Sequence, residues 1–363
     1  MNSQEVGTNA LPGVPPGHRV GRDFADRAIA EICEGLSLDA DKAERMMELV
    51  INSELSSDAI ELYLTSLAEK GESVDELVGS ATALRRACVK FPACGPLLDN
   101  CGTGGDGAGT FNISTVAALV IASAGQPIVK HGNRSASGRV GSADLLEALG
   151  IDIALDVEPA RRCLTRTNFA FLFAPRYHPA AKSVASIRRR IGRPTIFNWL
   201  GPICNPANPQ FQLLGVPNAR FAETIALTCL RLGLKRAFVV SNSEGVDELM
   251  PFGENRVLIA EDGRIEEFIL NAQDANVDEC MGSSLQGGDV ARNKEIALEV
   301  LSGAKGARRD AVLLNAAAAL LCTRAAGTLI DGMRNCARAI DSGKTIELLR
   351  HLQKFHDAED AKT

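Results

Sequence analysis

The sequence NCGTGGDGAGTFNIST at residues 100–115 decides the fold, and a second stretch, KHGNRSASGRVGSAD at 130–144, shares its character. Five glycines fall between residues 102 and 109. Because glycine has no Cβ, backbone amides in such a loop can approach a ligand that side chains would otherwise keep away. Two such loops in succession predict a ligand with two separated anionic groups.

The end of the first stretch has the composition of a helix start. Asn112, Ser114 and Thr115 precede the apolar run VAALVI at 116–121. Side chains of this kind cap helices, and the free amides and dipole at a helix N-terminus attract anions. Alone, the NxST pattern is more typical of a simple cap, but beside the glycine loop it predicts a phosphate cradle.

The second stretch follows a predicted strand, PIV at 127–129. Lys130 is therefore expected at the carboxyl end of a strand, the edge at which open α/β sheets bind ligands. Other candidate donors in this loop are Arg134, Arg139, Ser135, Ser137 and Ser142. A solvated basic loop is the alternative, and the adjoining strand and many small residues weigh against it. His131 is as compatible with a structural role as with acid–base chemistry.

An acidic pair and a basic helix are further candidates. Asp247 and Glu248 follow a predicted strand at 237–240, and adjacent carboxylates are hard oxygen ligands suited to Mg²⁺ that bridges to phosphate. The alternative for this pair is the acidic first turn of a helix. Arg188 heads a predicted basic helix, where its guanidinium could bind a carboxylate through two parallel hydrogen bonds or be an ordinary surface charge.

Composition excludes several other classes of function. A length of 363 residues favours two structural units, and 45% hydrophobic and 23% charged residues are ordinary for a globular protein. The net charge of −6 provides no general attraction to nucleic acid or anionic membranes, although basic residues cluster between 176 and 193. Ten scattered cysteines without a CxxC pair indicate reduced thiols. No apolar run reaches the roughly 20 residues of a spanning helix, so we expect a cytoplasmic protein.

The chain divides by composition into two kinds of segment. Residues 1–23 are rich in Pro and Gly and predict a disordered lead-in. Helical periodicity without β-branched runs predicts a small all-helical domain from residues 24–92, to which the Pro-terminated helical segment 183–208 returns. Elsewhere short apolar segments alternate with helices, which predicts an α/β domain with a mostly parallel central sheet flanked by helices. This domain comprises residues 93–182 and 209–356, and a polar tail follows at 357–363.

These stretches together resemble one family, the anthranilate phosphoribosyltransferases, from about residue 24 to 355. Many blocks occur in the family's order, which makes a chance match very improbable. The blocks are GTGGD at 102–106, NxST at 112–115, KHGNR at 130–134, GSADLLEALG at 141–150, APRYHPA at 174–180, NWLGPICNP at 198–206, the DE pair at 247–248, LLNAAAAL at 313–320 and IDSGK at 340–344.

The resemblance implies transfer of a phosphoribosyl group from 5-phosphoribosyl diphosphate (PRPP) to the amino group of anthranilate, with release of diphosphate, in tryptophan biosynthesis. It also implies a helical domain built from two chain segments beside an α/β domain of the nucleoside phosphorylase and phosphoribosyltransferase type. Mg²⁺ would be the cofactor, and the chain would form a homodimer through the helical domain. Neither nucleic acid nor a membrane is expected as a partner.

The same resemblance assigns site residues. The PRPP-binding set is Gly102, Gly105, Asp106, Thr110, Asn112, Ile113, Ser114, Thr115, Lys130, His131, Gly132, Asn133, Arg134, Ser135, Ala136, Ser137, Gly138 and Ser142. The anthranilate-binding set is Gly102, Asn133 and Arg188, and the metal-binding set is Ser114, Asp247 and Glu248. We expect catalysis by positioning and electrostatics, with His131 as the one candidate for an acid–base role.

The chain departs from the family pattern at three places. Val140 stands where a small polar residue is usual, Trp199 where an aliphatic residue is usual, and Ser241-Asn242 where His-Gly is usual. No departure removes an assigned residue, so they bear on the fine geometry of the site.

Two other functions fit parts of the sequence. A pyrimidine-nucleoside phosphorylase shares the fold and the glycine loops, but it needs neither a carboxylate-binding arginine nor an acidic metal pair. A catalytically silent relative could bind nucleic acid through the arginines at 176–193, with salt-dependent affinity. The net charge and the intact acidic pair argue against this second alternative.

Overall fold

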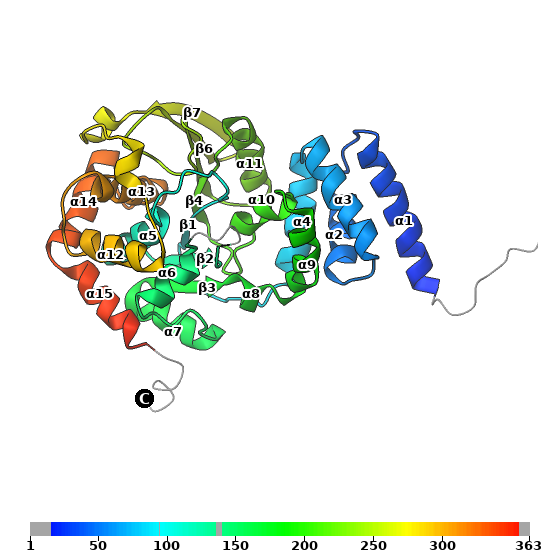
Figure 1. Cartoon of the computed structure of the whole chain (residues 1–363), viewed down its shortest axis with the longest axis horizontal. Helices are drawn as coiled ribbons and strands as arrows, with labels where there is room; N and C mark the ends of the chain where they lie inside the picture. Colours follow the sequence, from blue (N-terminus) through cyan, green and yellow to red (C-terminus); the bar gives the residue numbers. More distant parts are fainter. Residues whose placement is uncertain (1–15, 94, 136–139, 356–363) are drawn as a thin grey trace, which may run out of the picture.

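A seven-stranded sheet forms the centre of the larger part of the molecule (Figure 1). The computed structural model describes residues 16–93, 95–135 and 140–355. The strand order is β3-β2-β1-β4-β5-β6-β7. The strands are β1 (Leu98–Gly102), β2 (Ile128–Gly132), β3 (Phe169–Phe173), β4 (Phe211–Gly215), β5 (Arg236–Asn242), β6 (Asn255–Glu261) and β7 (Arg264–Leu270). Strands β1 to β5 run parallel and β6 and β7 are antiparallel, which confirms the mostly parallel sheet and adds an edge that the sequence did not predict.

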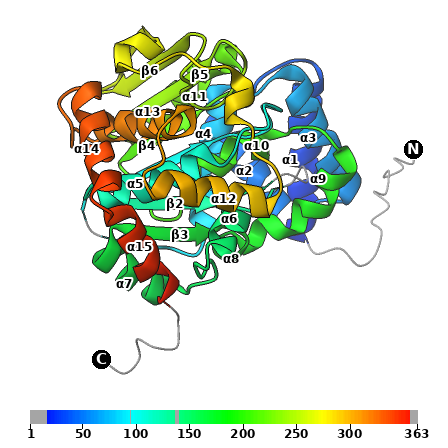
Figure 2. The same cartoon turned by 60° about the vertical axis from the view of Figure 1, so that its left-hand side comes forward.

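Helices cover both faces of this sheet (Figure 2). One face is covered by α5 (Ile113–Ser123), α6 (Ser142–Ala148), α7 (Val157–Thr167), α12 (Val290–Leu301), α13 (Ala307–Cys322), α14 (Leu329–Asp341) and α15 (Lys344–Gln353). The other face meets α11 (Ala219–Arg231). Successive side chains of a strand point to opposite faces, so Val240 joins the first core and Val239 the second. Both faces are therefore apolar, as a buried parallel sheet requires.

The smaller part of the molecule is entirely helical. It contains α1 (Pro16–Cys33), α2 (Ala40–Ile51), α3 (Ser57–Lys70) and α4 (Val74–Ala87), with α9 (Ala185–Ile191) packed on α3 and α10 (Ile196–Ile203) packed on α3 and α4. The short α8 (Ala174–Tyr177) and the 3₁₀ turn η1 (Pro179–Val184) lead into α9. The remaining 3₁₀ turns are η2 (Ala272–Ala275) and η3 (Gly282–Leu285).

Local capping explains where the N-terminal helices begin. Ser56 accepts a hydrogen bond from the Ala59 amide at 3.2 Å and so starts α3. Ser73 and Glu76 form a reciprocal capping box at the start of α4. The buried Glu76 carboxylate also pairs with Lys70 at 2.9 Å, which ties α4 to the end of α3.

The helical part shares a core with the sheet. Leu64 of α3, Ile225 of α11 and Val239 of β5 belong to one continuous cluster of buried apolar side chains. Arg85 at the end of α4 bonds across this junction, because its guanidinium donates to the Leu232 carbonyl at the end of α11 at 3.3 Å. The two parts are thus joined by packing as well as by the chain.

Two sequence expectations need correction here. Helix α1 already begins at Pro16, so the predicted disordered lead-in is wrong for residues 16–23, and residues 1–15 lie outside the described residues. Arg188 lies in the last turn of α9 and does not head that helix. No helix of the described part of the chain is long and apolar enough to cross a membrane.

The bulky Trp199 is accommodated between the two parts. Its indole Nε1 donates to Glu72 Oε2 at 3.1 Å, and its ring lies on Phe221 of α11 with centroids 4.1 Å apart. Burial raises the pKa of Glu72 above its ordinary value. The larger side chain therefore fills space at the junction of α10 and α11 and gains a polar partner.

Candidate active site

The carboxyl ends of the parallel strands bring together the predicted ligand loops. Strand β1 leads into the glycine loop, β2 into the second loop, and β5 into an irregular turn, residues 243–254, that carries Asp247 and Glu248. A Cβ at Gly102 would lie 2.1 Å from Asp247 Oδ2, and one at Gly215, the last residue of β4, would lie 1.6 Å from the Asp247 carbonyl oxygen. Glycine at these two strand ends is what admits Asp247 to the site.

The acidic pair connects both parts of the first loop. Asp247 Oδ2 accepts from the Gly104 amide at 2.6 Å, and Glu248 Oε1 accepts from the Ser114 amide at 3.1 Å. Burial is the main cause that raises the pKa of both carboxyl groups well above the ordinary range; Asp106 adds to the effect at Asp247, and Asp247 adds to it at Glu248. Two buried carboxylates that resist ionisation together are a donor set that a divalent cation would stabilise. The oxygen chemistry of the pair, with the nearby Ser114 hydroxyl, therefore fits Mg²⁺.

The start of α5 differs in one detail from the sequence prediction. Asn112 occupies the N-cap position, but its side chain makes no capping hydrogen bond. Its Nδ2 donates to the Val140 carbonyl at 2.7 Å, and its Oδ1 accepts from Asn293 at 3.1 Å. The prediction of a side-chain cap at Asn112 is wrong, because the side-chain amide of Asn112 bonds Val140 and Asn293 and not the first turn of α5. The same bond shows that Val140 contributes its backbone here, whatever its side chain.

The remaining members of the first stretch divide between loop and core. Gly104, Gly105, Gly107 and Gly109 have φ near +75°, between +71° and +79°, a conformation that glycine adopts without strain. Thr110 pairs as an isolated bridge with Gln286. Ile113 and Thr115 are buried, so either could reach a ligand only through its backbone.

Lys130 is a buried cation at the floor of the site. Its Nζ donates to the Asn100 carbonyl at 2.6 Å and lies 3.4 Å from Ser114 Oγ. It also lies near Asp99 and Glu248, since its charge lowers the pKa of each against the larger effect of burial. Two of its three hydrogen bonds, to Asn100 Oδ1 and Ser114 Oγ, are long at 3.4 Å, so a phosphate oxygen could replace one of these partners.

The second loop is anchored to α6. Arg134 pairs with Asp144 at 2.9 Å and Glu147 at 2.8 Å, so its charge is balanced on α6. The Ser135 amide donates to Asp144 Oδ2 at 3.2 Å, and Ser142 Oγ donates to the Asn133 carbonyl at 3.3 Å. A Cβ at Gly132 would lie 2.2 Å from Ser142 Oγ, which shows how closely the loop approaches α6. The assigned residues Ala136, Ser137 and Gly138, and with them Arg139, lie outside the described residues.

His131 forms a buried pair with His178. The ring centroids are 5.0 Å apart, and His131 Nδ1 lies 3.0 Å from the Gly201 carbonyl, to which it donates. Burial lowers the pKa of His131 to about 3 and that of His178 to about 4. Near neutral pH His131 is therefore uncharged and does not carry the imidazolium proton that a general acid would donate.

The buried neutral state of His178 predicts a pH effect on stability. Its folded pKa of about 4 lies below the unfolded value of 6.5, so only the unfolded chain takes up a proton between these values. The free energy of unfolding should therefore fall as the pH falls through this window, by about 1.4 kcal/mol per pH unit for this group. We measure the free energy of unfolding in urea at about pH 7 and about pH 5. Between these values it should fall by about 2 kcal/mol less in His178→Gln than in the parent protein. His351→Gln, on an exposed position of α15, is the control, and parallel pH profiles for all three proteins would contradict the assignment.

Arg188 is half-buried at the edge of the helical part. Its guanidinium lies over the Phe197 ring, 5.2 Å from the centroid, and Nη2 is 3.5 Å from Asn198 Oδ1. Burial lowers its pKa, and within the described residues it forms no salt bridge. The Phe197 ring therefore orients the Arg188 guanidinium, and no carboxylate of the described residues pairs with it.

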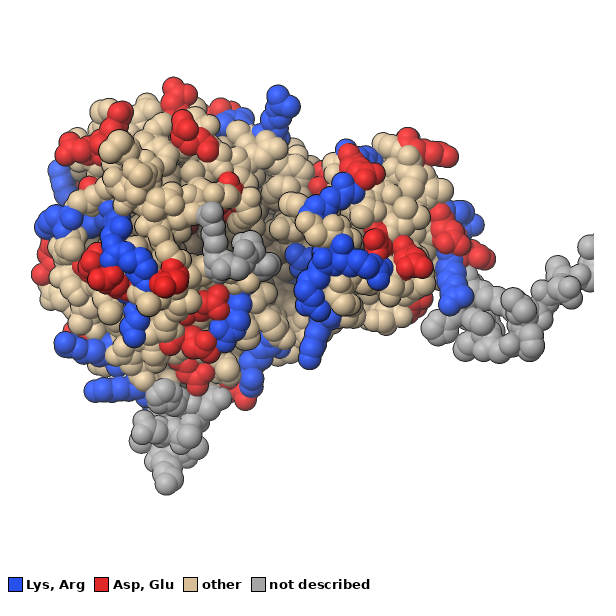
Figure 3. Space-filling view, viewed as in Figure 1, with Lys and Arg blue, Asp and Glu red and all other residues tan. Residues whose placement is uncertain are grey.

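Several other members of the basic cluster are paired with carboxylates. Arg190 pairs with Glu61, and Arg193 pairs with Glu69 at 2.6 Å. Figure 3 shows Lys and Arg side chains on the helical part where it borders the groove between the two parts. These ion pairs reduce the positive field that the nucleic-acid alternative requires.

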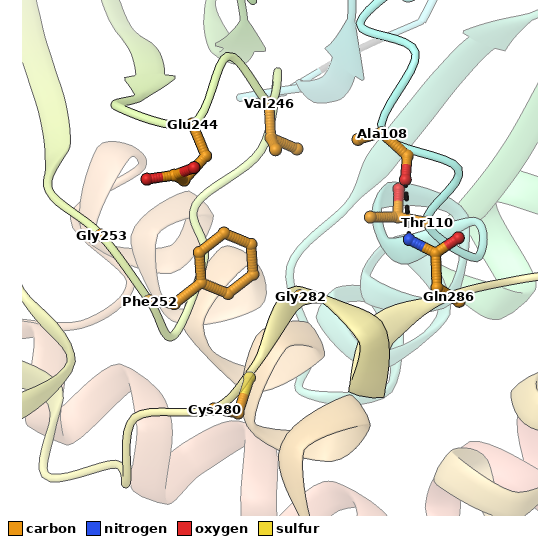
Figure 4. Close-up of a pocket in the computed structure, with 9 residues that line it drawn as sticks. All are labelled: Ala108, Thr110, Glu244, Val246, Phe252, Gly253, Cys280, Gly282 and Gln286. Carbon is orange, nitrogen blue, oxygen red and sulfur yellow. Dashed lines mark hydrogen bonds between the residues drawn. The ribbon is translucent and has the colours of Figure 1, made fainter.

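A cavity of about 360 Å³ lies behind the glycine loop (Figure 4). It is lined by Thr110 from the loop, Val246 and Phe252 from the 243–254 turn, and the segment 280–286. Gln286 closes one side by donating to the Ala108 carbonyl at 2.9 Å. Asp247 and Glu248 instead border a narrow void with no room for water, so this cavity is separate from the acidic pair.

Several buried polar residues of the site were missed from the sequence. Asp99 accepts from Asn205 Nδ2 at 2.9 Å, and Asn205 also donates to the Val129 carbonyl at 2.8 Å. This network joins β1 and β2 to the segment that returns from the helical part. Asn255 and Asn315 bond the backbone next to the acidic pair. A lone Asn in the apolar helix sequence LLNAAAAL was a signal that could have identified Asn315.

Comparison with known proteins first defines a class. The model of the α/β domain of a glycosyl transferase family matches residues 94–346, and that of the helical bundle domain of the family matches residues 26–88. The fold is that of a glycosyl transferase of this two-part type.

Individual relatives define the family within that class. Anthranilate phosphoribosyltransferase from Syntrophomonas wolfei is 41% identical over 331 residues, which is 91% of this chain and 97% of the relative. The enzyme of that name from Solibacter usitatus is 44% identical over 330 residues, or 90% and 97%. The crystal structure of anthranilate phosphoribosyltransferase from Thermus thermophilus matches with a TM-score of 0.85 at 36% identity, covering 90% of this chain and 98% of the other. The chain belongs to the anthranilate phosphoribosyltransferase family.

A more distant structure has the same fold. The Saccharomyces cerevisiae anthranilate phosphoribosyltransferase, in complex with PRPP and Mg, matches with a TM-score of 0.83 at 24% identity, covering 91% of this chain and 97% of the other.

Proposed function

We propose that this chain transfers the 5-phosphoribosyl group of PRPP to the amine of anthranilate, giving N-(5-phosphoribosyl)anthranilate and diphosphate, in tryptophan biosynthesis. One observation carries this proposal. Asp247 is buried, the adjacent Glu248 is half-buried, and their carboxylates accept from the amides of Gly104 and Ser114, the two places where phosphate groups are expected. A cation held by this pair would therefore lie between the protein and a diphosphate.

The residues of the site divide into three proposed roles. Asp247, Glu248 and Ser114 would hold Mg²⁺. The glycine loop, the start of α5, Lys130 and the loop that follows β2 would bind PRPP, with Arg134, whose charge is balanced on α6, acting through its backbone. Arg188, Asn133 and the backbone at Gly102 would bind anthranilate. The role proposed for Arg188 is supported by its position over the Phe197 ring and by the lack of a carboxylate partner among the described residues.

The reaction needs little covalent help from the protein. The bond from ribose C1 to the diphosphate oxygen breaks as the ribose gains oxocarbenium character and the electron pair moves to the leaving diphosphate. Bound Mg²⁺ would supply positive charge to that leaving group. Loop amides and the Lys130 ammonium would donate hydrogen bonds to the phosphate oxygens as their charge grows. Arg188 and Asn133 would aim the anthranilate amine, which needs no prior deprotonation, at C1. Once the bond from nitrogen to C1 has formed, the nitrogen would lose one proton to solvent, which leaves the neutral secondary amine of the product.

Three expectations extend this proposal. We propose a homodimer formed through the helical part, where Leu36 and Leu62 are 54% and 49% exposed and would be covered by such a contact. The domain limits of 24–92 and 183–208 for that part remain a proposal, with α1 extending it to residue 16. A cytoplasmic location also remains a prediction.

The test is a coupled set of assays on the purified protein. We expect anthranilate fluorescence to fall when PRPP and Mg²⁺ are both added and to stay constant when either is left out. Thymidine with inorganic phosphate is the parallel substrate pair. Phosphorolysis of thymidine without any PRPP-dependent change would replace the proposal with the phosphorylase alternative, and salt-dependent binding of single-stranded DNA without turnover would favour the silent relative.

A further inference from the structure

The turn that carries the acidic pair lacks regular structure of its own. We call residues 243–254, which join β5 to β6, the carboxylate turn. Leu249 and Met250 follow Asp247-Glu248 directly, and both are fully buried. Buried peptide groups need hydrogen-bond partners, and neither residue belongs to a strand or helix that would supply them. Their partners are the side chains of asparagines.

Asn315 of α13 bonds both polar groups of Leu249. Its Oδ1 accepts from the Leu249 amide at 3.1 Å, and its Nδ2 donates to the Leu249 carbonyl at 2.8 Å. The same Nδ2 also donates a second hydrogen bond, to the Ala311 carbonyl of α13 at 2.9 Å. Because α13 is packed into the main core, Asn315 ties the carboxylate turn to a rigid element.

Asn255, the first residue of β6, does the same for Met250. Its Oδ1 accepts from the Met250 amide at 2.8 Å, and its Nδ2 donates to the Met250 carbonyl at 2.9 Å. The same Nδ2 also donates a hydrogen bond to the Leu270 carbonyl of β7 at 3.0 Å. Two consecutive residues beside the acidic pair, Leu249 and Met250, are therefore each held at both the backbone amide and the backbone carbonyl.

Asn242, the last residue of β5, completes the network. Its Nδ2 donates to Asn255 Oδ1 at 3.0 Å and to the Phe252 carbonyl at 2.8 Å, and its Oδ1 accepts from the Glu244 amide at 2.9 Å. Figure 4 shows Glu244 and Phe252 on opposite limbs of the carboxylate turn, which this single side chain joins. Asn242 is also one of the departures from the family pattern, and the usual glycine could make none of these three bonds.

We propose that Asn242, Asn255 and Asn315 are positioning residues that hold Asp247 and Glu248 in the arrangement required to bind Mg²⁺ together with PRPP. This inference rests on the proposed function. Two adjacent carboxylates repel each other, and an irregular turn could relax by moving them apart. The asparagines restrain the backbone on the protein side, while the Gly104 and Ser114 amides meet the carboxylates on the ligand side. A fully satisfied buried network of this kind is rigid.

The test compares asparagine variants with a matched control. Asn315→Leu and Asn255→Leu remove the bonds to the turn at nearly constant volume. Thr345→Val is the control, because Thr345 is also fully buried and donates one bond to a backbone carbonyl, Leu301 at 2.8 Å, between α15 and α12. We would measure the dissociation constant of Mn²⁺ by electron paramagnetic resonance with PRPP present, the Mg²⁺ concentration for half-maximal rate, the anthranilate KM and the thermal midpoint.

We expect the Mn²⁺ dissociation constant and the Mg²⁺ requirement to rise about tenfold or more in both leucine variants, as for other groups that orient metal ligands. The anthranilate KM should change less than about twofold, high Mg²⁺ should restore most of kcat, and Thr345→Val should lower only the thermal midpoint. Unchanged Mn²⁺ binding in leucine variants that melt like the control would overturn the proposal. Should the leucine variants not fold, Asn242→Gly decides: binding weakened about threefold or more supports the proposal, and unchanged binding overturns it. If the parent protein itself binds no Mn²⁺ with PRPP, the proposed function fails instead.

Discussion

Asp247→Asn is expected to lower kcat by about 10²- to 10³-fold at saturating Mg²⁺, PRPP and anthranilate, because it removes one charge from the proposed cation site. The amide is nearly isosteric with the carboxyl group, and its oxygen can still accept from Gly104. Folding should remain intact, since the neutral side chain also relieves repulsion from Asp106 and Glu248. The rate is followed by the loss of anthranilate fluorescence, and the thermal midpoint by calorimetry.

The control for this variant is Asp262→Asn. Asp262 lies in the exposed β6–β7 turn with φ of +49°, a conformation that asparagine tolerates well. Its rate should match that of the parent protein. A kcat for Asp247→Asn that is unchanged at saturating Mg²⁺ would refute the role of Asp247.

Arg188→Ala should raise the KM for anthranilate by about 100-fold, the effect of losing a pair of charge-assisted hydrogen bonds of roughly 3 kcal/mol. The KM for PRPP should change far less, because Arg188 of α9 belongs to the set assigned to anthranilate and not to the set assigned to PRPP. The anthranilate KM of Arg188→Lys should lie between that of the parent protein and that of Arg188→Ala, since lysine keeps the charge but not the planar pair of donors. Steady-state kinetics with each substrate varied in turn measures the split.

Arg189→Ala is the matched control for Arg188, because the next residue of α9 is exposed and carries the same charge. It should leave both KM values within about twofold of the parent protein, as is usual for an exposed position. Equal increases in both KM values for Arg188→Ala would reject the assignment to anthranilate.

Much of the architecture could be predicted because its signals are local. The strand that leads to the second loop, the helix that begins near Ser114 and the glycines between residues 102 and 109 are all encoded within short windows, and the structure has each of them. One boundary was wrong: β2 runs from Ile128 to Gly132, so Lys130 lies inside the strand and does not follow it. The antiparallel strands β6 and β7 were not predicted, because their pairing at the sheet edge is set by contacts between segments rather than by one window.

Side-chain partners were harder to predict than elements. Asn112 has the sequence context of a cap, yet it bonds Asn293, which is 181 positions away. Arg134 was expected to add charge to a ligand loop, yet Asp144 and Glu147 balance it on the next helix. In both places a local propensity was overridden by a partner that the fold brings near. The acidic pair was identified from the sequence, whereas the bonds that Asn242, Asn255 and Asn315 make to its turn depend on contacts between distant segments and were not predicted.

The shared core of the helical part and the sheet has a consequence for how the chain could be divided. Helix α4, which precedes residue 92, packs on α11, and α11 packs on β5 and β6, so all of them belong to one apolar cluster. Cutting the chain at that point would leave a water-exposed apolar surface on both fragments. We therefore expect neither fragment to fold by itself, and we expect co-expressed halves to become soluble only by reassociating.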